Sequence, residues 1–297
     1  RRQPTPADAV KAVVASQHLT PTPQPVANVE DRKIPGPAGA GDVAVRVYTP
    51  DGTGPFPVVV YIHGGGWVIA DLDVYDSSPR ALANAVPAVV VSVEYRKAPE
   101  HPFPASVQDV HAAWRWTVMH AAEINGDPTR IAIAGESAGG NMATVVAMMA
   151  RDNGEQMPVH QLLVYPVTDF KTNTPSYMEY ADAKPLNRDM MIWFADQVIP
   201  NLADRTNPYA APLYGDLADM PPATVILAEI DPLRSEGEAY VERLRAAGVP
   251  VRATLFKGVT HEFFGMAAVL DASKEAIAEA AEELRASFGV GATGAVL

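Results

Sequence analysis

The stretch "RIAIAGESAGGNMATVVAMMA", residues 130–150, decides the fold. It begins with an apolar run that is typical of a buried strand and ends in a run that predicts a helix. The turn between them, "GESAGG" at 135–140, carries a Gly-x-Ser-x-Gly pattern. A strand, a tight turn and a helix in direct succession are what a nucleophile elbow requires, with Ser137 at its tip. The pattern alone is weak, because a glycine-rich turn with a bystander serine has the same spacing.

Apolar runs of the same kind recur along the chain and lack the alternation of half-buried strands. They lie at 57–62, 88–95, 161–166, 223–229 and 251–256. Helical stretches separate most of them, and this order predicts an α/β fold with a mostly parallel central sheet flanked by helices. Before the first run, residues 29–34 and 42–50 enclose the turn-forming segment 35–41 and predict a β-hairpin.

The composition fits a globular core and excludes several classes of partner. Of the 297 residues, 48% are hydrophobic and 20% are charged, and the net charge is −12. Because there is no basic run, we expect neither nucleic acid nor an anionic membrane surface as a partner. The chain contains no cysteine, which excludes disulfides, thiolate metal sites and cysteine nucleophiles. The longest aliphatic run, 86–93, is far too short to span a bilayer, so we expect no stable membrane insertion.

The location of the protein is less constrained by its sequence. The chain starts at Arg1 without a methionine, so the native start is missing. We expect a cytoplasmic protein, while a removed signal peptide stays open. Assembly into a homo-oligomer stays open as well.

A serine nucleophile needs a base that takes its proton and an acid that orients the base. In a sheet of this kind the acid and then the histidine follow the serine along the chain. Asp231 comes just past the run 223–229, and His261 comes just past the run 251–256. Loops that leave the carboxyl ends of parallel strands share one edge of the sheet with Ser137. We therefore interpret Asp231 as the acid and His261 as the base, although each alone would be an ordinary loop residue.

Three consecutive glycines follow the run at 57–62, in "YIHGGGWV", residues 61–68. Without side chains in the way, such a segment can turn its backbone N–H groups inward, which suits an oxyanion hole. A glycine hinge or an anion nest would have the same sequence. His63 precedes the glycines, and we interpret it as a residue that holds the loop in place rather than as a catalytic group.

Several motifs together resemble the hormone-sensitive-lipase-like esterases of the α/β-hydrolase fold, the bacterial family IV group. They are "HGGGW" at 63–67, "EYRKAPEHPFPA" at 94–105, "GESAGGN" at 135–141, "DPLRSEG" at 231–237 and "THEFFG" at 260–265. The order and spacing of these motifs are specific as a set, and the resemblance covers about residues 45–266, most of the chain.

The resemblance implies a serine carboxylesterase with Ser137 as nucleophile, His261 as base and Asp231 as its acid partner. It implies an oxyanion hole formed by the backbone N–H groups of Gly65, Gly66 and Ala138. The substrate would be a small-molecule ester of short or medium acyl chain. Neither a metal nor an organic cofactor is needed for this chemistry.

The chain departs from the common pattern of that family at four positions. Glu136 stands where aspartate is frequent, and this longer acid should reach a different partner. Ser235 stands where a second aspartate is usual, Glu262 where glycine is common, and Lys97 where leucine is common. None of the four removes a residue of the implied triad or an oxyanion donor, so they bear on the surroundings of the site rather than on the reaction class.

The resemblance also implies a helical cap above the sheet. Residues 1–40 would form its N-terminal segment and residues 170–206 its insertion, while 41–169 and 207–297 would form the hydrolase core. In the first segment, "TPADAVKAVVAS" at 5–16 predicts a helix with a threonine cap and a proline at the first position.

The insertion contains "NRDMMIWFADQVI", residues 187–199, which predicts a helix with an asparagine N-cap and two apolar faces. One face would pack within the cap and the other would roof the site. The candidate pocket residues are Trp67, Met190, Trp193 and Phe194. Because this roof is bulky, we expect a short acyl tunnel and a preference for chains of about four to eight carbons.

Two other functions use the same sequence features. An amidase, a lactonase or a peptidase would share the triad, and the sequence does not separate them from an esterase. A non-catalytic small-molecule receptor on this fold would lack the catalytic histidine, and the presence of His261 argues against it.

Overall fold

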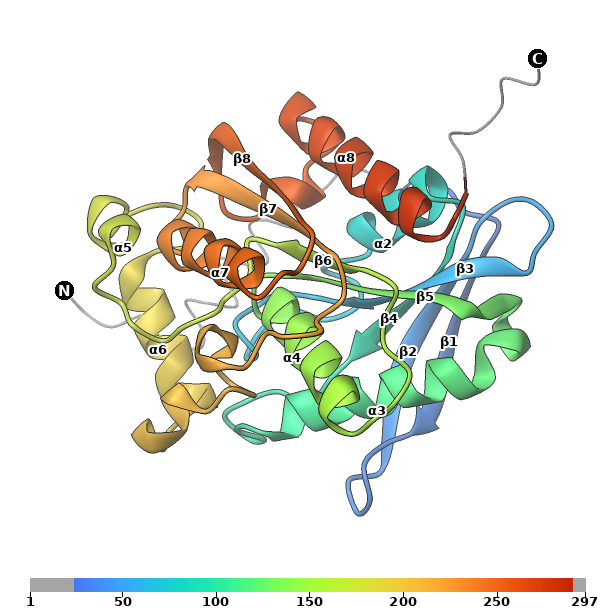
Figure 1. Cartoon of the computed structure of the whole chain (residues 1–297), viewed down its shortest axis with the longest axis horizontal. Helices are drawn as coiled ribbons and strands as arrows, with labels where there is room; N and C mark the ends of the chain where they lie inside the picture. Colours follow the sequence, from blue (N-terminus) through green and yellow to red (C-terminus); the bar gives the residue numbers. More distant parts are fainter. Residues whose placement is uncertain (1–23, 291–297) are drawn as a thin grey trace.

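A single sheet of eight strands runs through the computed structural model, which describes residues 24–290 (Figure 1). The strands are β1 Asn28–Pro35, β2 Asp42–Thr49, β3 Phe56–Ile62, β4 Val89–Glu94, β5 Gly126–Glu136, β6 Gln161–Val164, β7 Ala223–Ile230 and β8 Val251–Thr260. Their order across the sheet is β1-β2-β4-β3-β5-β6-β7-β8. β2 runs antiparallel to β1 and to β4, and every other neighbouring pair is parallel. The predicted hairpin and the mostly parallel sheet are confirmed.

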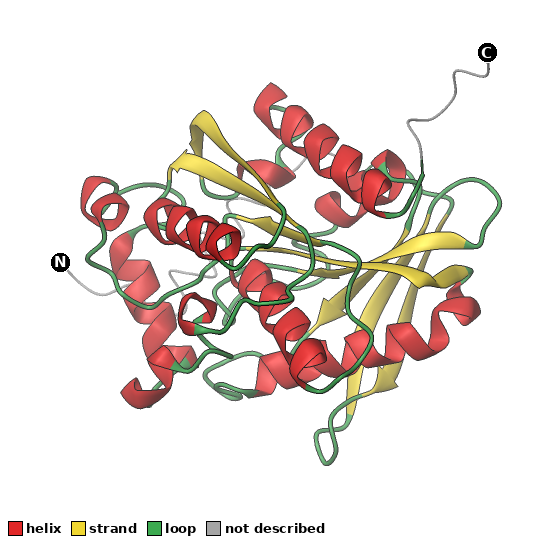
Figure 2. Ribbon diagram, in the orientation of Figure 1, coloured by secondary structure: helices red, strands yellow, loops and turns green. Residues whose placement is uncertain are grey.

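Helices cover both faces of the sheet (Figure 2). Within residues 24–290 the α-helices are α2 Ser77–Ala85, α3 Ala105–His120, α4 Ala138–Asp152, α5 Pro175–Glu179, α6 Arg188–Val198, α7 Arg234–Ala246 and α8 Asp271–Ser287. Figure 1 shows α3, α4 and α7 on one side of the sheet and α2 and α8 on the other. None of the helices in this range is long and apolar enough to cross a membrane.

The burial of β3 explains why its sequence is apolar at every position. Val58 and Val60 pack into the hydrophobic cluster on the side of α3 and α4, whereas Val59 and Tyr61 pack into the cluster on the side of α2 and α8. Successive side chains of a strand point to opposite faces, so a central strand between two helical layers has no polar face. The unbroken apolar runs in the sequence therefore mark the central strands.

Some strand boundaries differ from those that the sequence predicted. β8 continues to Thr260, four residues beyond the predicted end, because after a register shift Thr260 pairs with Ile230 of β7. β6 ends at Val164 instead of residue 166, since the next residue, Tyr165, has a φ of 33° that no strand continues. These ends matter because the strands deliver the site residues.

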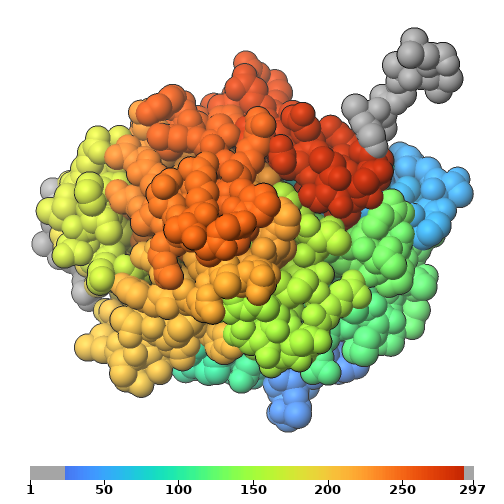
Figure 3. All heavy atoms as spheres, in the orientation of Figure 1, coloured from blue at the N-terminus to red at the C-terminus, as the bar shows by residue number. Residues whose placement is uncertain are grey.

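The segment from 170 to 210 contains no strand and lies at one end of the molecule, beside α7 (Figure 3). The predicted helix of this segment is confirmed as α6. The side chain of Asn187 accepts a hydrogen bond from the N–H of Met190 at 2.9 Å, as an N-cap should. The helix predicted at 5–16 lies outside the described residues.

One predicted boundary needs correction. β1 falls within the predicted N-terminal cap segment, residues 1–40, yet it pairs with β2 over its whole length. Backbone hydrogen bonds of an outer strand are satisfied by its neighbour, so residues 28–35 belong to the sheet. The remaining division into cap and core stays a prediction.

Candidate active site

Ser137 stands on a strained turn between β5 and α4. Its φ of 57° and ψ of −118° are rare for a residue with a side chain. A Cβ added at Gly135 would clash with the carbonyl oxygen of Gly139, and one added at Gly139 would clash with the carbonyl oxygen of Ile62. Only glycine fits at both positions, so the close approach of these three segments fixes the turn that presents the serine.

The structure brings Ser137, Asp231 and His261 together. His261 Nε2 lies 3.0 Å from Ser137 Oγ, and His261 Nδ1 lies 2.7 Å from Asp231 Oδ2. All three side chains are buried. The other oxygen of Asp231 accepts the N–H of Leu233 at 2.9 Å, which holds the carboxylate in place. Because a carboxylate only accepts, Nδ1 carries the imidazole proton and Nε2 is left to accept from the serine hydroxyl.

Three strand ends position these residues. Ser137 follows β5, Asp231 follows β7 and His261 follows β8, and these strands run parallel. The carboxyl ends of parallel strands meet at one edge of the sheet, which is where ligands bind in open α/β folds. Residues that are up to 124 positions apart in the chain therefore lie within hydrogen-bond distance.

The glycine loop lies at the end of β3, next to the elbow. Gly65 has a φ of 98° and Gly66 a φ of 58°. Among the backbone hydrogen bonds of residues 24–290, the N–H groups of Gly65 and Gly66 have no acceptor. Ala138 opens α4, so its N–H has no intrahelical partner either. Three candidate donors are thus available beside Ser137.

His63 anchors this loop, as the sequence predicted. Its Nδ1 lies 2.7 Å from the carbonyl oxygen of Gly64. Its ring stacks on that of Tyr95, with the ring centroids 4.3 Å apart. The hydroxyl of Tyr95 donates to the same carbonyl oxygen at 2.9 Å. Burial lowers the pKa of His63 to about 3, so the ring stays neutral and serves as a fixed support.

The family model described as the alpha/beta hydrolase fold matches residues 59–265, more than half of the chain. The chain belongs to the α/β-hydrolase family. Within it, the chain falls in the hormone-sensitive-lipase-like esterase group that its motifs indicated.

Named relatives and solved structures agree with this placement. The carboxylesterase NlhH of Mycobacterium tuberculosis is 44% identical over 280 residues, which cover 92% of this chain and 88% of the relative. The ethyl acetate hydrolase of Pseudomonas putida is 36% identical over 81% of this chain and 77% of its own length. The solved structure of a hyperthermophilic esterase from the archaeon Pyrobaculum calidifontis superposes with a TM-score of 0.88. It is 40% identical and covers 94% of this chain and 92% of that one.

Beneath the site, the hydrolase buries a carboxylate that the sequence had marked as unusual. The side chain of Glu136 accepts hydrogen bonds from the hydroxyls of Tyr61 at 2.5 Å and Tyr165 at 2.6 Å. The ring of Tyr165 in turn lies 4.3 Å from the ring of His261. Sequence reasoning missed both tyrosines, although each lies at the carboxyl end of a predicted central strand, the edge where Ser137 was expected.

The surroundings of Glu136 raise the pKa of its carboxyl group. Burial and the nearby charge of Glu262 raise its pKa to about 7, against the opposing hydrogen bonds from Tyr165 and Tyr61. A carboxyl group has an ordinary pKa of about 4.3, so Glu136 is partly protonated at neutral pH.

Nearby carboxylates also raise the pKa of the His261 imidazole. Burial by itself would lower the pKa of His261, but the charge and hydrogen bond of Asp231 outweigh it, and Glu262 and Glu136 add to the rise. The net effect raises the pKa of His261 above its ordinary value. Oε1 of Glu262 lies 3.7 Å from His261 Nε2.

The predicted pocket residues are only partly brought to the site. Phe194 of α6 lies against the glycine loop, where a Cβ on Gly66 would meet its ring. Trp193 contacts Phe194, with their ring centroids 5.2 Å apart, and Trp67 lies 5.8 Å from the ring of Phe170. Met190 is partly buried and packs against the hydrophobic core cluster.

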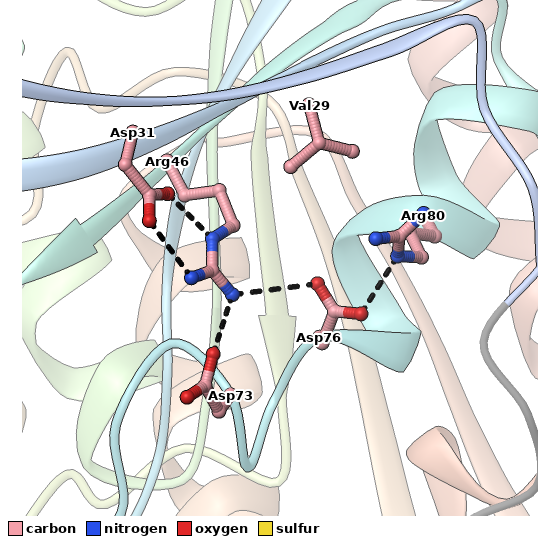
Figure 4. A pocket seen from close by; sticks show the side chains of 6 residues that line it. All are labelled: Val29, Asp31, Arg46, Asp73, Asp76 and Arg80. Carbon is pink, nitrogen blue, oxygen red and sulfur yellow. Dashed lines mark hydrogen bonds and ion pairs between the residues drawn. The ribbon is translucent and has the colours of Figure 1, made fainter.

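A separate cavity of about 360 Å³ opens between β1, β2 and α2 (Figure 4). Its lining residues are Val29, Asp31, Arg46, Asp73, Asp76 and Arg80. Both cations of this cavity are held in ion pairs, since Arg46 pairs with Asp31 and Asp73, and Arg80 pairs with Asp76. It shares no lining residue with the predicted site. Within residues 24–290, no group of three or more histidines or acids could hold a metal ion.

The first prediction concerns the pH dependence of the reaction. A base acts in its neutral form, and the raised pKa of His261 keeps the ring protonated to a higher pH than usual. We expect kcat/KM to fall on acidification with a midpoint above about pH 6.5. Glu136→Gln removes one of the carboxylates that raise the pKa of His261, so the midpoint of kcat/KM for this variant should lie at a lower pH than that of the wild type. A wild-type midpoint below about pH 6 in initial-rate measurements would contradict this account.

The second prediction concerns stability. The folded protein holds the proton of Glu136 up to a pKa of about 7, whereas the unfolded chain releases it near about 4.3. The stabilisation from this bound proton is therefore present below pH 4 and is lost as the pH rises through 7, a change of about 4 kcal/mol. Glu136→Gln lacks this term. In thermal melts between about pH 5 and 8, the wild type should lose stability relative to the variant as the pH rises. If the melting temperatures of the two proteins change with pH in parallel, the raised pKa of Glu136 is contradicted.

Proposed function

We propose that this chain is a serine carboxylesterase that hydrolyses esters of short- to medium-chain acids through an acyl-enzyme. The observation that carries the proposal is the hydrogen-bonded series from Ser137 Oγ through His261 to Asp231 at the carboxyl edge of the sheet. The names of the relatives, a carboxylesterase and an ethyl acetate hydrolase among them, support ester hydrolysis.

The proposed reaction begins when Ser137 Oγ attacks the ester carbonyl carbon and passes its proton to His261 Nε2. The carbonyl oxygen becomes an oxyanion, held by the N–H groups of Gly65, Gly66 and Ala138, each donor contributing about 3 kcal/mol to the transition state. The C–O bond to the alcohol then breaks, and His261 returns the proton to the leaving oxygen. Water repeats these steps on the acyl-enzyme and releases the acid.

Asp231 has a supporting role in this proposal. Its carboxylate accepts the Nδ1 proton at 2.7 Å and so fixes the ring and its tautomer. It also stabilises the imidazolium that forms while the serine proton is held on Nε2. Amide, lactone and peptide hydrolysis would use the same groups, and no relative reported above carries such a name.

The third prediction tests the nucleophile and the acid. Ser137→Ala should lower kcat for ester hydrolysis by about 10⁶-fold. Asp231→Asn should lower it by about 10⁴-fold, because an amide favours the wrong tautomer of the histidine. Both variants should remain folded by circular dichroism. Asp42→Asn, an exposed residue at the start of β2, is the matched control and should keep wild-type activity.

A hydrolysis panel of esters, amides and lactones completes this test. Turnover by Ser137→Ala near the wild-type rate would remove the serine assignment. A wild-type enzyme that cleaves amides or lactones faster than esters of the same acid would replace the esterase by one of its alternatives.

The preference for short acyl chains rests on α6. Phe194 presses on Gly66, so the roof over the proposed oxyanion hole is an aromatic ring. We propose that Trp67, Met190, Trp193 and Phe194 limit the length of the acyl pocket. Residues 170–206 would then act as a cap insertion, together with the part of the N-terminal segment that precedes β1.

The fourth prediction is a chain-length profile. Hydrolysis should be fastest for acyl chains of about four to eight carbons, because each methylene gains about 0.8 kcal/mol only while it fits. Phe194→Ala should move the optimum to longer chains, and Trp193→Ala should do so to a smaller extent. Met178→Ala, at an exposed position of α5, serves as the control. A wild-type optimum at about sixteen carbons would contradict the short pocket.

A further inference from the structure

We infer that Glu262 selects the alcohol part of the substrate, favouring esters whose alcohol carries a positive charge over those whose alcohol carries a negative charge. This inference rests on the proposed function, because it names a specificity of that same site. Glu262 directly follows the proposed base and takes no part in the reaction described above.

The carboxylate of Glu262 lies close to the reactive nitrogen of the His261 imidazole. Oε1 lies 3.7 Å from His261 Nε2, the nitrogen that faces the serine hydroxyl. The hydroxyl of Tyr75 donates to the two carboxylate oxygens at 2.7 and 2.8 Å. Tyr75 itself abuts the glycine loop, since a Cβ on Gly64 would clash with its hydroxyl. The carboxylate is thus fixed between the proposed base and the loop, and 30% of the side chain remains accessible.

The backbone at this position does not favour a glutamate. Glu262 has a φ of 71°, in the left-handed region that glycine enters at the least cost. A strained residue with a side chain at the edge of a site indicates a functional role for that side chain. The carboxylate supplies that role, because it is the part of the side chain that reaches the imidazole.

The reaction geometry places the leaving alcohol close to this charge. Nε2 must return its proton to the leaving oxygen, which requires a separation of about 3 Å. The leaving oxygen therefore lies no more than about 7 Å from the Glu262 carboxylate. The acyl carbonyl oxygen points instead toward the N–H donors of the glycine loop. Hence the charge of Glu262 bears first on substituents of the alcohol.

No lysine or arginine in the described part of the chain forms an ion pair with this carboxylate. The other charged groups next to the imidazole are Asp231 and Glu136, which are also acidic. A charge on the alcohol several ångströms away is therefore in a negative field, and its sign affects the rate.

Three acetate esters with alcohols of similar size test the inference. Acetylcholine carries a cation, 3,3-dimethylbutyl acetate is its neutral isostere, and 3-sulfopropyl acetate carries an anion. We expect the wild-type kcat/KM to fall in that order at low ionic strength. In Glu262→Gln the ratio of the cationic to the anionic ester should shrink by about tenfold or more. Glu242→Gln, an exposed residue of α7 with the same change in net charge, should keep the wild-type ratio.

The outcomes separate a charge effect from a structural one. If Glu262→Gln lowers kcat/KM for all three esters equally and leaves their ratio unchanged, the carboxylate only supports Tyr75 and the inference is overturned. Should Glu262→Gln fold poorly, Glu262→Gly removes the same charge at a φ that suits glycine, and it must show the same loss of ratio. A wild-type protein inactive on the neutral ester would overturn the proposed function and this inference together. An active one with no charge preference overturns the inference alone.

Discussion

The close approach of α4 to the end of β3 is the constraint on which the site depends. The first turn of the helix lies so near the strand that only glycine fits at position 139, against the carbonyl oxygen of Ile62. This contact bends the chain at Ser137 into its positive φ and brings the helix N-terminus beside the glycine loop. One contact therefore sets both the exposure of the serine and the position of two groups of N–H donors, which electrostatic stabilisation of an oxyanion requires.

The acids around the imidazole of His261 are a second determinant of the site. Glu136, Glu262 and Asp231 each raise the pKa of His261, while Tyr61, Tyr75 and Tyr165 provide the hydroxyls that bind two of these acids. Buried carboxylates are costly unless they are hydrogen-bonded or protonated, and this group uses both solutions. The proposed base thus has a proton affinity set by several charges whose effects oppose that of burial. Because the charge of Glu262 helps to raise the pKa of both Glu136 and His261, removing it should lower both.

Most of the frame could be predicted from the sequence, because its causes are local. Unbroken apolar runs follow from burial of a central strand on both faces, and the paired glycines around Ser137 follow from a turn that excludes Cβ atoms. The positions of Asp231 and His261 followed from the rule that loops at the carboxyl ends of parallel strands share an edge. The contacts of Glu136 with Tyr61 and Tyr165 could not be read in this way, since pairing between strands brings them together over 75 and 29 positions. The hairpin strand β1 could be predicted as a strand, but the family resemblance placed residues 1–40 in the cap, and it is the pairing of β1 with β2 that assigns this strand to the sheet.

Two departures from the family pattern, Glu136 and Glu262, take on a common meaning in the structure. In the sequence they lie far apart and each looks like a single change in a motif. In the fold they act on one imidazole: Glu136 binds Tyr165, whose ring lies against that of His261, and the carboxylate of Glu262 lies 3.7 Å from Nε2. Glu262 also helps to raise the pKa of Glu136, so the two carboxyl groups are electrostatically coupled. An enzyme with aspartate and glycine at these positions would keep the same nucleophile, base and oxyanion donors but would have a weaker field at the leaving group. The backbone of the fold therefore fixes where the nucleophile, the base and the oxyanion donors lie. The charge around them is set by side chains at positions that can vary without changing the fold.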